Sequence, residues 1–279
     1  MESNRIVEVL HDRGAQTSPR WLLGSGFLIR SNVVVTAAHN LGPQNPASDT
    51  SDTTVRTFTG SEHSVISVLA RDDQIDLAVL AVANLVADPV KFAKVDRTRA
   101  DLLREVTAVG FPNYKYAEDR PIQQSRQPAQ PSGSVPMLEN FSTGNLVLKL
   151  EAGEPAAGDN GSASPWAGMS GAGVFVGDYL LGVVIEHHMA DGLGALHFAP
   201  LTLIESLPVS RATVFSAVLG IADWGALVVA NTAPALDGID AALVQDLTEI
   251  RELLKQGLLE SPDATTLRIM AMKKFKGYG

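Results

Sequence analysis

The sequence contains no cysteine and no long uninterrupted apolar run. The absence of cysteine excludes disulfide bonds and thiolate metal sites. The most apolar segment, residues 214–230, contains Asp223 and two glycines, so a buried helix or strand pair fits it better than a membrane span. The first residues, MESNRIVEVLHDRG, lack the basic start and apolar run of a signal peptide. Together these features favour an intracellular, cytoplasmic protein with no membrane contact.

Positive charge is also scarce. There are 22 Lys and Arg against 31 Asp and Glu, which gives a net charge of -9 and a pI near 5.1. Nucleic-acid binding needs a basic face, so no nucleic-acid partner is expected. With 45% hydrophobic residues and 19% charged residues over 279 positions, the chain can bury a substantial core. It has room for one large domain, or for one domain with an appendage.

What the sequence does contain, as far as about residue 200, is a series of short apolar stretches. They are rich in Val, Ile, Leu and Phe and are separated by Gly, Pro, Asn and Asp, which is typical of an all-β barrel or sandwich. The stretches are residues 5–10, 21–29, 33–37, 65–70, 77–82, 105–111, 145–150, 173–176, 179–185 and 195–199. Two polar stretches, 41–54 and 113–142, interrupt the series and are predicted to be loops.

The pattern changes after residue 200. Residues 201–207 are typical of a short closing helix, and apolar residues recur at helical spacing over 239–259. Asp237 is a suitable N-cap for that second helix, and Gly257 a suitable end. We therefore predict a first domain over residues 1–207 and a mostly helical C-terminal appendage over 208–279. The appendage either docks or oligomerises, or it packs on the first domain and covers apolar surface.

Three residues far apart in the sequence have the types that acyl transfer requires: a nucleophile, a base and an orienting carboxylate. His39 is the one histidine of six that ends an apolar strand among small residues, in VVVTAAHN. Asp76 stands at the head of the apolar strand in DQIDLAVL, and Ser170 lies within PWAGMSGAGVF. Taken singly, each has a structural interpretation as a strand end, a solvated edge or a glycine-rich turn.

Other chemistries fit these residues less well. GMSGA is not the G-x-S-x-G elbow of an α/β-hydrolase, and in that fold the acid and the histidine follow the serine. A metal site built from Glu186, His187, His188 and His197 matches no known ligand spacing. The sequence therefore predicts neither a metal nor a cofactor.

Taken together, GSGFLI, VVVTAAH, DQIDLAVL, VGFP and GMSGAGVF resemble trypsin-like serine peptidases over about residues 5–205. The resemblance implies an all-β fold of two antiparallel six-stranded barrels of the chymotrypsin type, to which the helical appendage is added. It also implies that Ser170 is the nucleophile, His39 the general base and acid, and Asp76 the orienting carboxylate. The N–H groups of Gly168 and Ser170 would then form the oxyanion hole.

The resemblance has informative departures. Met169 stands where secreted members have an aspartate that pairs with a newly cut N-terminus, so activation by N-terminal cleavage is not expected. Ser164 at the implied base of the substrate pocket argues against an acidic, trypsin-type pocket. The implied walls are formed by Ile185, Glu186 and His187 on one side and by Leu196 and His197 on the other. They suggest a narrow pocket or one that recognises charge, unless the alignment slips and the histidines lie at the surface.

The predicted function is a serine endopeptidase that cleaves protein or peptide substrates through an acyl-enzyme. A catalytically silent scaffold that binds protein partners is the alternative. A third possibility is a latent protease that an activating partner switches on through the C-terminal helical region. PWAGMSGA and DYLLGVVI look like intracellular bacterial trypsin-like domains found beside signalling or defence modules.

Overall fold

The computed structural model describes residues 3–43, 52–98, 100–115, 126–140, 142–151, 164–186 and 194–231. They belong to one compact unit, Met1–Thr232. The second unit, Ala233–Gly279, lies outside the described residues, and so does the helix predicted over 239–259. The docking or oligomerising role of the C-terminal region stays a prediction.

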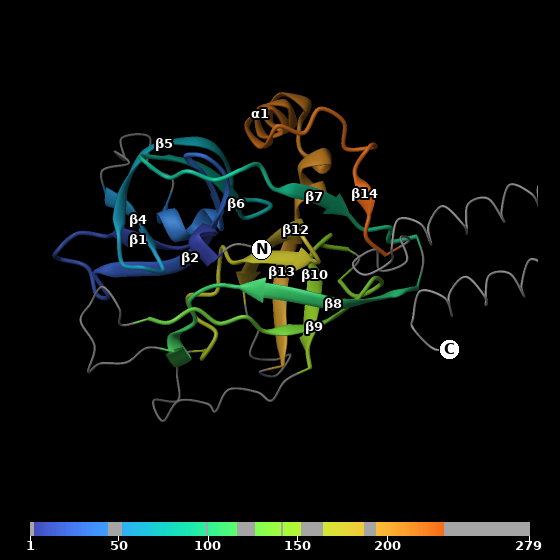
Figure 1. The fold of residues 1–279 in the computed structure, drawn as a ribbon, viewed down its shortest axis with the longest axis horizontal. Helices are drawn as coiled ribbons and strands as arrows, with labels where there is room; N and C mark the ends of the chain where they lie inside the picture. The colour runs from blue at the N-terminus through green and yellow to red at the C-terminus, as the bar shows by residue number, and fades with distance from the viewer. Residues whose placement is uncertain are drawn as a thin grey trace, which may run out of the picture. The chain divides into compact units, whose positions relative to one another are not determined.

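Six antiparallel strands close the first barrel (Figure 1). In barrel order they are β1 (Ile6–Asp12), β2 (Trp21–Arg30), β3 (Val33–Thr36), β6 (Leu77–Val82), β5 (Glu62–Asp72) and β4 (Thr53–Thr57). Every residue of β3 is buried, because one face of this strand fills the barrel and the other meets the second barrel. This double burial explains the unbroken apolar sequence VVV.

The second barrel closes in the same way. Its strands, in order, are β11 (Gly173–Val176), β8 (Leu102–Val109), β9 (Ser132–Pro136), β10 (Leu146–Leu150), β13 (Ala195–Pro200) and β12 (Tyr179–Glu186). The pairing of β11 with β12 completes the circle, and β7 (Lys91–Lys94) and β14 (Val228–Val229) extend the sheet in parallel beyond β12. The two six-stranded barrels confirm the predicted fold class.

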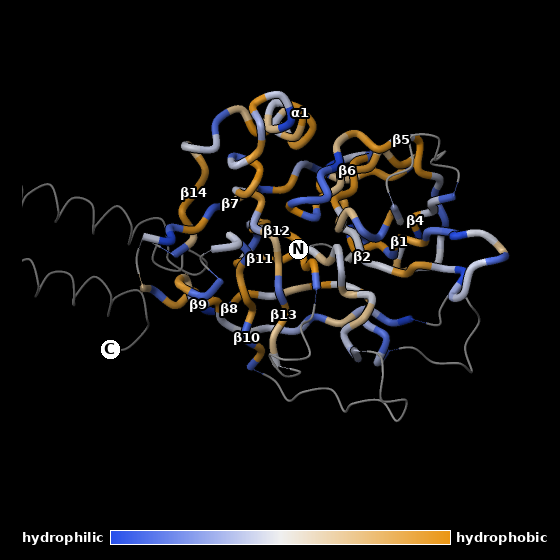
Figure 2. The backbone as a smooth tube through the Cα atoms, turned by 180° about the vertical axis from the view of Figure 1, so that it is seen from behind, coloured by the Kyte–Doolittle hydropathy of each residue, from blue (hydrophilic) through white to orange (hydrophobic). Residues whose placement is uncertain are grey.

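An apolar interface joins the barrels. The rings of Phe27 and Phe175 meet edge to face with centroids 4.7 Å apart, and Val35, Phe111 and Val183 pack in the same cluster. Burying a side chain of this size contributes about 1.5–3 kcal/mol. Figure 2 shows this apolar character along the strands of both barrels. The interface fixes the loops of one barrel against those of the other.

Short helices complete the unit. They are the 3-10 helices η1 (Ser3–Arg5), η2 (Ala38–Leu41), η4 (Asn113–Lys115) and η7 (Leu201–Ser206) and the α-helix α1 (Val209–Leu219). The short closing helix predicted over 201–207 is thus confirmed as η7. Helix α1 buries Phe215 and Leu219 in the interface cluster, and Gly220 ends it at φ 76°. Among the described residues, no helix has the length and apolar character needed to cross a membrane.

Four strands of the described residues were not among the predicted stretches: β4, β7, β9 and the two-residue β14. Strand β9 lies within the polar stretch 113–142 that was predicted to be a loop, and its sequence, SGSVP, carries a single branched apolar residue. The second residue of β9, Gly133, lies so close to the backbone of β10 that an added Cβ would be 1.9 Å from the carbonyl oxygen of Lys149. The strand therefore forms through close pairing with β10 rather than through a strong local pattern.

Candidate active site

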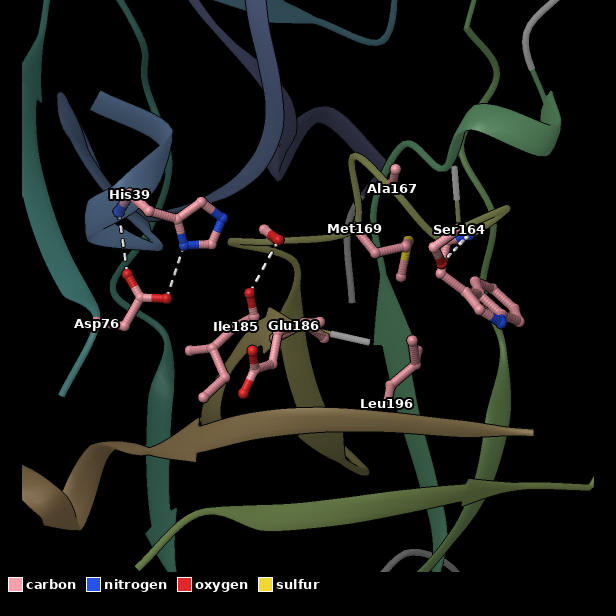
Figure 3. Close-up of a pocket in the computed structure, with 11 residues that line it drawn as sticks. His39, Asp76, Ser164, Ala167, Met169, Ile185, Glu186 and Leu196 are labelled. Atoms are coloured by element: carbon pink, nitrogen blue, oxygen red, sulfur yellow. Dashed lines mark hydrogen bonds and ion pairs between the residues drawn. The ribbon is translucent and has the colours of Figure 1, made fainter. Parts of the chain in front are cut away.

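His39 lies in η2, one turn after the end of β3 rather than at the strand end itself. Its ring Nδ1 is 2.7 Å from Oδ2 of Asp76, and its backbone N–H donates to Oδ1 of the same carboxylate at 3.0 Å (Figure 3). Because a carboxylate can only accept a hydrogen bond, Nδ1 is the donor to Asp76, and Nε2 is the ring nitrogen left for a substrate. The His39 side chain is 50% exposed. The imidazole is thus oriented and open to a substrate.

Asp76 is held in place by the turn that joins β5 to β6. Its φ of 51° lies in the left-handed region, which aspartate tolerates better than most residues. The buried carboxylate of Asp72 accepts the N–H groups of Gln74 and Ile75 at 2.9 and 3.2 Å. The carbonyl of Asp76 accepts the N–H of Ala38 at 3.2 Å. The turn therefore reaches η2 through both its backbone and the Asp76 carboxylate.

Ser170 comes from the second barrel, in the loop before β11, and this loop is tied to the first barrel. Its carbonyl accepts the N–H of Ser25 at 2.7 Å and Nδ2 of Asn40 at 2.8 Å. Its hydroxyl donates to the carbonyl of Ile185 at 2.9 Å. Within the described part of the chain, the hydroxyl is bonded to Ile185 and not to His39. His39, Asp76 and Ser170 therefore lie in one place, but no hydrogen bond joins the Ser170 hydroxyl to the His39 ring in this conformation.

Ser25 is a residue of the site that sequence reasoning missed. It is fully buried, and its hydroxyl donates to the carbonyl of Gly168 at 2.6 Å and accepts the N–H of Phe111 at 2.8 Å. The neighbouring Gly24 leaves room for the Asn40 amide, since a Cβ on Gly24 would lie 2.2 Å from it. The small-residue motif GSG was the available signal: it places a hydrogen-bonding serine where the two barrels touch.

Gly168 adopts φ 92°, which only glycine adopts without strain. Across the described residues, the backbone N–H groups of Gly168 and Ser170 donate no hydrogen bond. They remain available to an oxygen atom of a ligand. Met169 between them is 1% exposed and packs in the core of the second barrel with Trp166 and Leu196. At position 169 the loop is therefore anchored by a buried apolar side chain.

A cavity of about 400 Å³ opens at these residues, near the lower end for small-molecule pockets (Figure 3). It is lined by His39, Asp76, Ser164, Trp166, Ala167, Met169, Ser170, Val184, Ile185, Glu186 and Leu196. All three candidate catalytic residues and four of the six candidate pocket residues therefore share one cavity.

The remaining two pocket candidates stand apart. His197 does not line the cavity: it is buried, and its Nδ1 lies 3.3 Å from Nδ2 of Asn140. Successive side chains of a strand point to opposite faces, so Leu196 on β13 faces the cavity and His197 does not. His187 lies outside the described residues. Among the described residues, no cluster of three or more His, Asp or Glu could hold a metal ion.

The chain matches the family model of the trypsin-like peptidase domain over residues 24–183. Among solved structures, it is similar to the active form of the Rv3671c protease from M. tuberculosis, with 16% identity, a TM-score of 0.48, and coverage of 82% of this chain and 86% of that one. An inactive serine-to-alanine mutant of Rv3671c gives 16% identity, a TM-score of 0.49, and coverage of 79% and 89%. No curated protein matches the sequence.

Proposed function

The chain belongs to the trypsin-like peptidase family, and on that premise we propose that it is a serine endopeptidase that uses His39, Asp76 and Ser170. The observation that supports this most is the His39–Asp76 pair, with its 2.7 Å bond, in one cavity with Ser170. A base with a fixed tautomer, a serine hydroxyl and two available N–H groups make up the set that acyl transfer needs.

In the proposed reaction, Ser170 Oγ attacks the scissile carbonyl while His39 Nε2 takes its proton. Asp76 holds the Nδ1 proton and stabilises the imidazolium that forms. The N–H groups of Gly168 and Ser170 receive the developing oxyanion. His39 then gives its proton to the leaving amine. In the second half of the reaction, His39 takes a proton from water, the water attacks the acyl-enzyme, and the proton returns to Ser170 Oγ as the product acid leaves.

Substrates are proteins or peptides, and Ser164, Ile185, Glu186 and Leu196 are the residues proposed to contact the side chain before the cleaved bond. The cavity combines apolar side chains with the Glu186 carboxylate at its edge. A basic or a mixed apolar and polar side chain would suit such a lining. His187 remains part of the proposed wall, whereas His197 is proposed to support β13 from its other face. Cleavage of a peptide library would identify the preferred sequence directly.

The position of the serine hydroxyl favours a resting state. Because Ser170 Oγ is bonded to Ile185, it must rotate before it can pass a proton to His39. This favours a latent protease. We propose that a protein partner switches it on through the region after residue 208, within a bacterial cytoplasmic signalling or defence system. The same observation favours, as a second candidate, a scaffold that has the site residues but binds partners without cleaving them.

A fluorophosphonate probe separates these proposals. An active peptidase is labelled at Ser170, and Ser170→Ala abolishes the labelling, while a latent one is labelled faster when its partner is added. A wild-type protein that resists the probe, alone and with its partners, contradicts peptidase activity. If Ser170→Ala and His39→Ala then keep full biological activity, the scaffold is the better description.

A further inference from the structure

The peptide that carries the N–H of Gly168 is held from its other side. In this peptide, between Ala167 and Gly168, the carbonyl of Ala167 accepts the backbone N–H of Asn113 at 2.8 Å. A peptide unit is planar, so a carbonyl fixed on one side fixes the direction of the N–H on the other. The orientation of the first proposed oxyanion donor therefore depends on where η4 holds Asn113.

Asn113 is held in turn by a buried arginine. Its side-chain Oδ1 accepts a hydrogen bond from Nη2 of Arg126. The side chain of Arg126 is 3% exposed, and its guanidinium lies against Gly168 itself. A Cβ on Gly168 would come 2.5 Å from Nη2 and 2.8 Å from Nη1. The missing side chain of Gly168 thus makes the space that the guanidinium occupies.

A carboxylate of the first barrel lies beside Arg126. Nη1 of Arg126 lies 3.6 Å from Oε1 of Glu8 on β1, while Nε and Nη2 of Arg56 on β4 donate to Oε2 of Glu8 at 2.8 and 2.6 Å. The side chains of Arg56 and Glu8 are 5% and 4% exposed. Charges at this depth persist only when they compensate one another. Arg56, Glu8 and Arg126 form what we name the buried charge cluster.

We propose that Arg126 is a positioning residue for the oxyanion hole. The buried charge cluster fixes its guanidinium, which holds Asn113 and fills the space beside Gly168, so that the Gly168 N–H points into the cavity. The inference rests on the proposed peptidase function and adds to it a set of supporting groups outside the triad. Arg126 touches neither substrate nor the reacting atoms. Arg126 acts only by setting the direction of the Gly168 N–H.

The test compares Arg126→Lys and Asn113→Ala with the wild type. Asn113→Ala removes the acceptor of Arg126 at an exposed position, and the melting temperature shows whether the fold is kept. Arg97→Lys is the matched control, because Arg97 is another arginine that holds a loop by hydrogen bonds, in its case to the carbonyls of Met137, Glu139 and Gly144. The limiting rate of fluorophosphonate labelling and the probe concentration at half saturation are measured together with the melting temperature.

We expect both variants to lower the limiting rate by about 10-fold to 100-fold, less than the roughly 10²–10³ lost when an oxyanion donor is removed outright. The half-saturating concentration stays within about twofold, since the cavity itself is unchanged. Arg97→Lys lowers the melting temperature without this loss of rate. Limiting rates within twofold of wild type for both variants would overturn the proposal.

A second measurement does not depend on activity. The Gly168 amide resonance in a ¹H–¹⁵N spectrum should shift in Asn113→Ala and Arg126→Lys and stay in place in Arg97→Lys. A wild type that the probe labels neither alone nor with its partners overturns the proposed function, and the amide shift then decides on the inference alone. An unmoved Gly168 resonance in both site variants would overturn it.

Discussion

Replacing Ser25 with alanine tests how firmly the first barrel holds the loop that carries Ser170. The change removes the donor to the Gly168 carbonyl, at 2.6 Å, and the acceptor of the Phe111 N–H, at 2.8 Å, at a fully buried position. Each buried polar group left without a partner costs about 1–3 kcal/mol, so two such groups cost about 2–6 kcal/mol. Removing the single hydroxyl oxygen changes the side-chain volume very little, so the loss comes from the hydrogen bonds.

The free energy of unfolding in urea measures this cost, and Ser31→Ala is the matched control. The hydroxyl of Ser31 also makes two hydrogen bonds, to the carbonyl and N–H of Ala87 at 3.1 Å each, but at an exposed position where water replaces them. We expect Ser31→Ala to cost less than about 1 kcal/mol. The labelling of Ser170 should also slow in Ser25→Ala alone. Equal unfolding free energies for the two variants would refute the reasoning.

Three further predictions concern other parts of the molecule. Gly168→Ala should reduce the rate of Ser170 labelling more than about 100-fold. The control is Gly14→Ala, at a similar φ of 89° but with nothing within 4 Å of an added Cβ. It should lower stability by about 1–2 kcal/mol and leave the labelling rate unchanged. Arg211→Ala leaves Oδ2 of the buried Asp72 without its 2.7 Å partner; since Arg211 is 62% exposed, we expect a loss of only about 1–2 kcal/mol in urea unfolding. Burial lowers the pKa of His11, so the unfolded chain takes up this proton first and stability falls as the pH drops below about 6.5. In His11→Gln that fall should be smaller, and an identical pH profile would contradict the assignment.

The sequence was sufficient to predict the fold class and to bring the candidate site together. His39, Asp76 and Ser170 each lie next to an apolar strand in the sequence. Closing a barrel restricts where the ends of its strands can lie, so residues at those ends have restricted positions. What supports these residues could not be predicted in the same way. Ser25, Asn113 and Arg126 act through pairings across 86 to 143 positions or through a single arginine in a polar segment, and such contacts leave no periodic pattern.

The pocket shows the same limit. Of the residues that the resemblance assigns to the substrate pocket, Ser164 and Leu196 line the cavity, whereas His197, one position on from Leu196, points to the other face of β13. A one-residue difference in register reverses which side chain meets the substrate. Register is set by the pairing of β13 with β10 and β12, which the sequence of β13 alone does not contain.

The bonds that hold the Ser170 loop start on the opposite barrel, and this has a consequence for control. The carbonyls of Gly168 and Ser170 accept hydrogen bonds from Ser25 and Asn40, so a small separation of the barrels would release the candidate nucleophile and both proposed oxyanion donors in one step. The hydrogen bonds that join the two barrels and those that hold the candidate catalytic loop are therefore the same bonds. A ligand that wedged the barrels apart would silence the enzyme without entering its cavity, and one that clamped them would do the reverse.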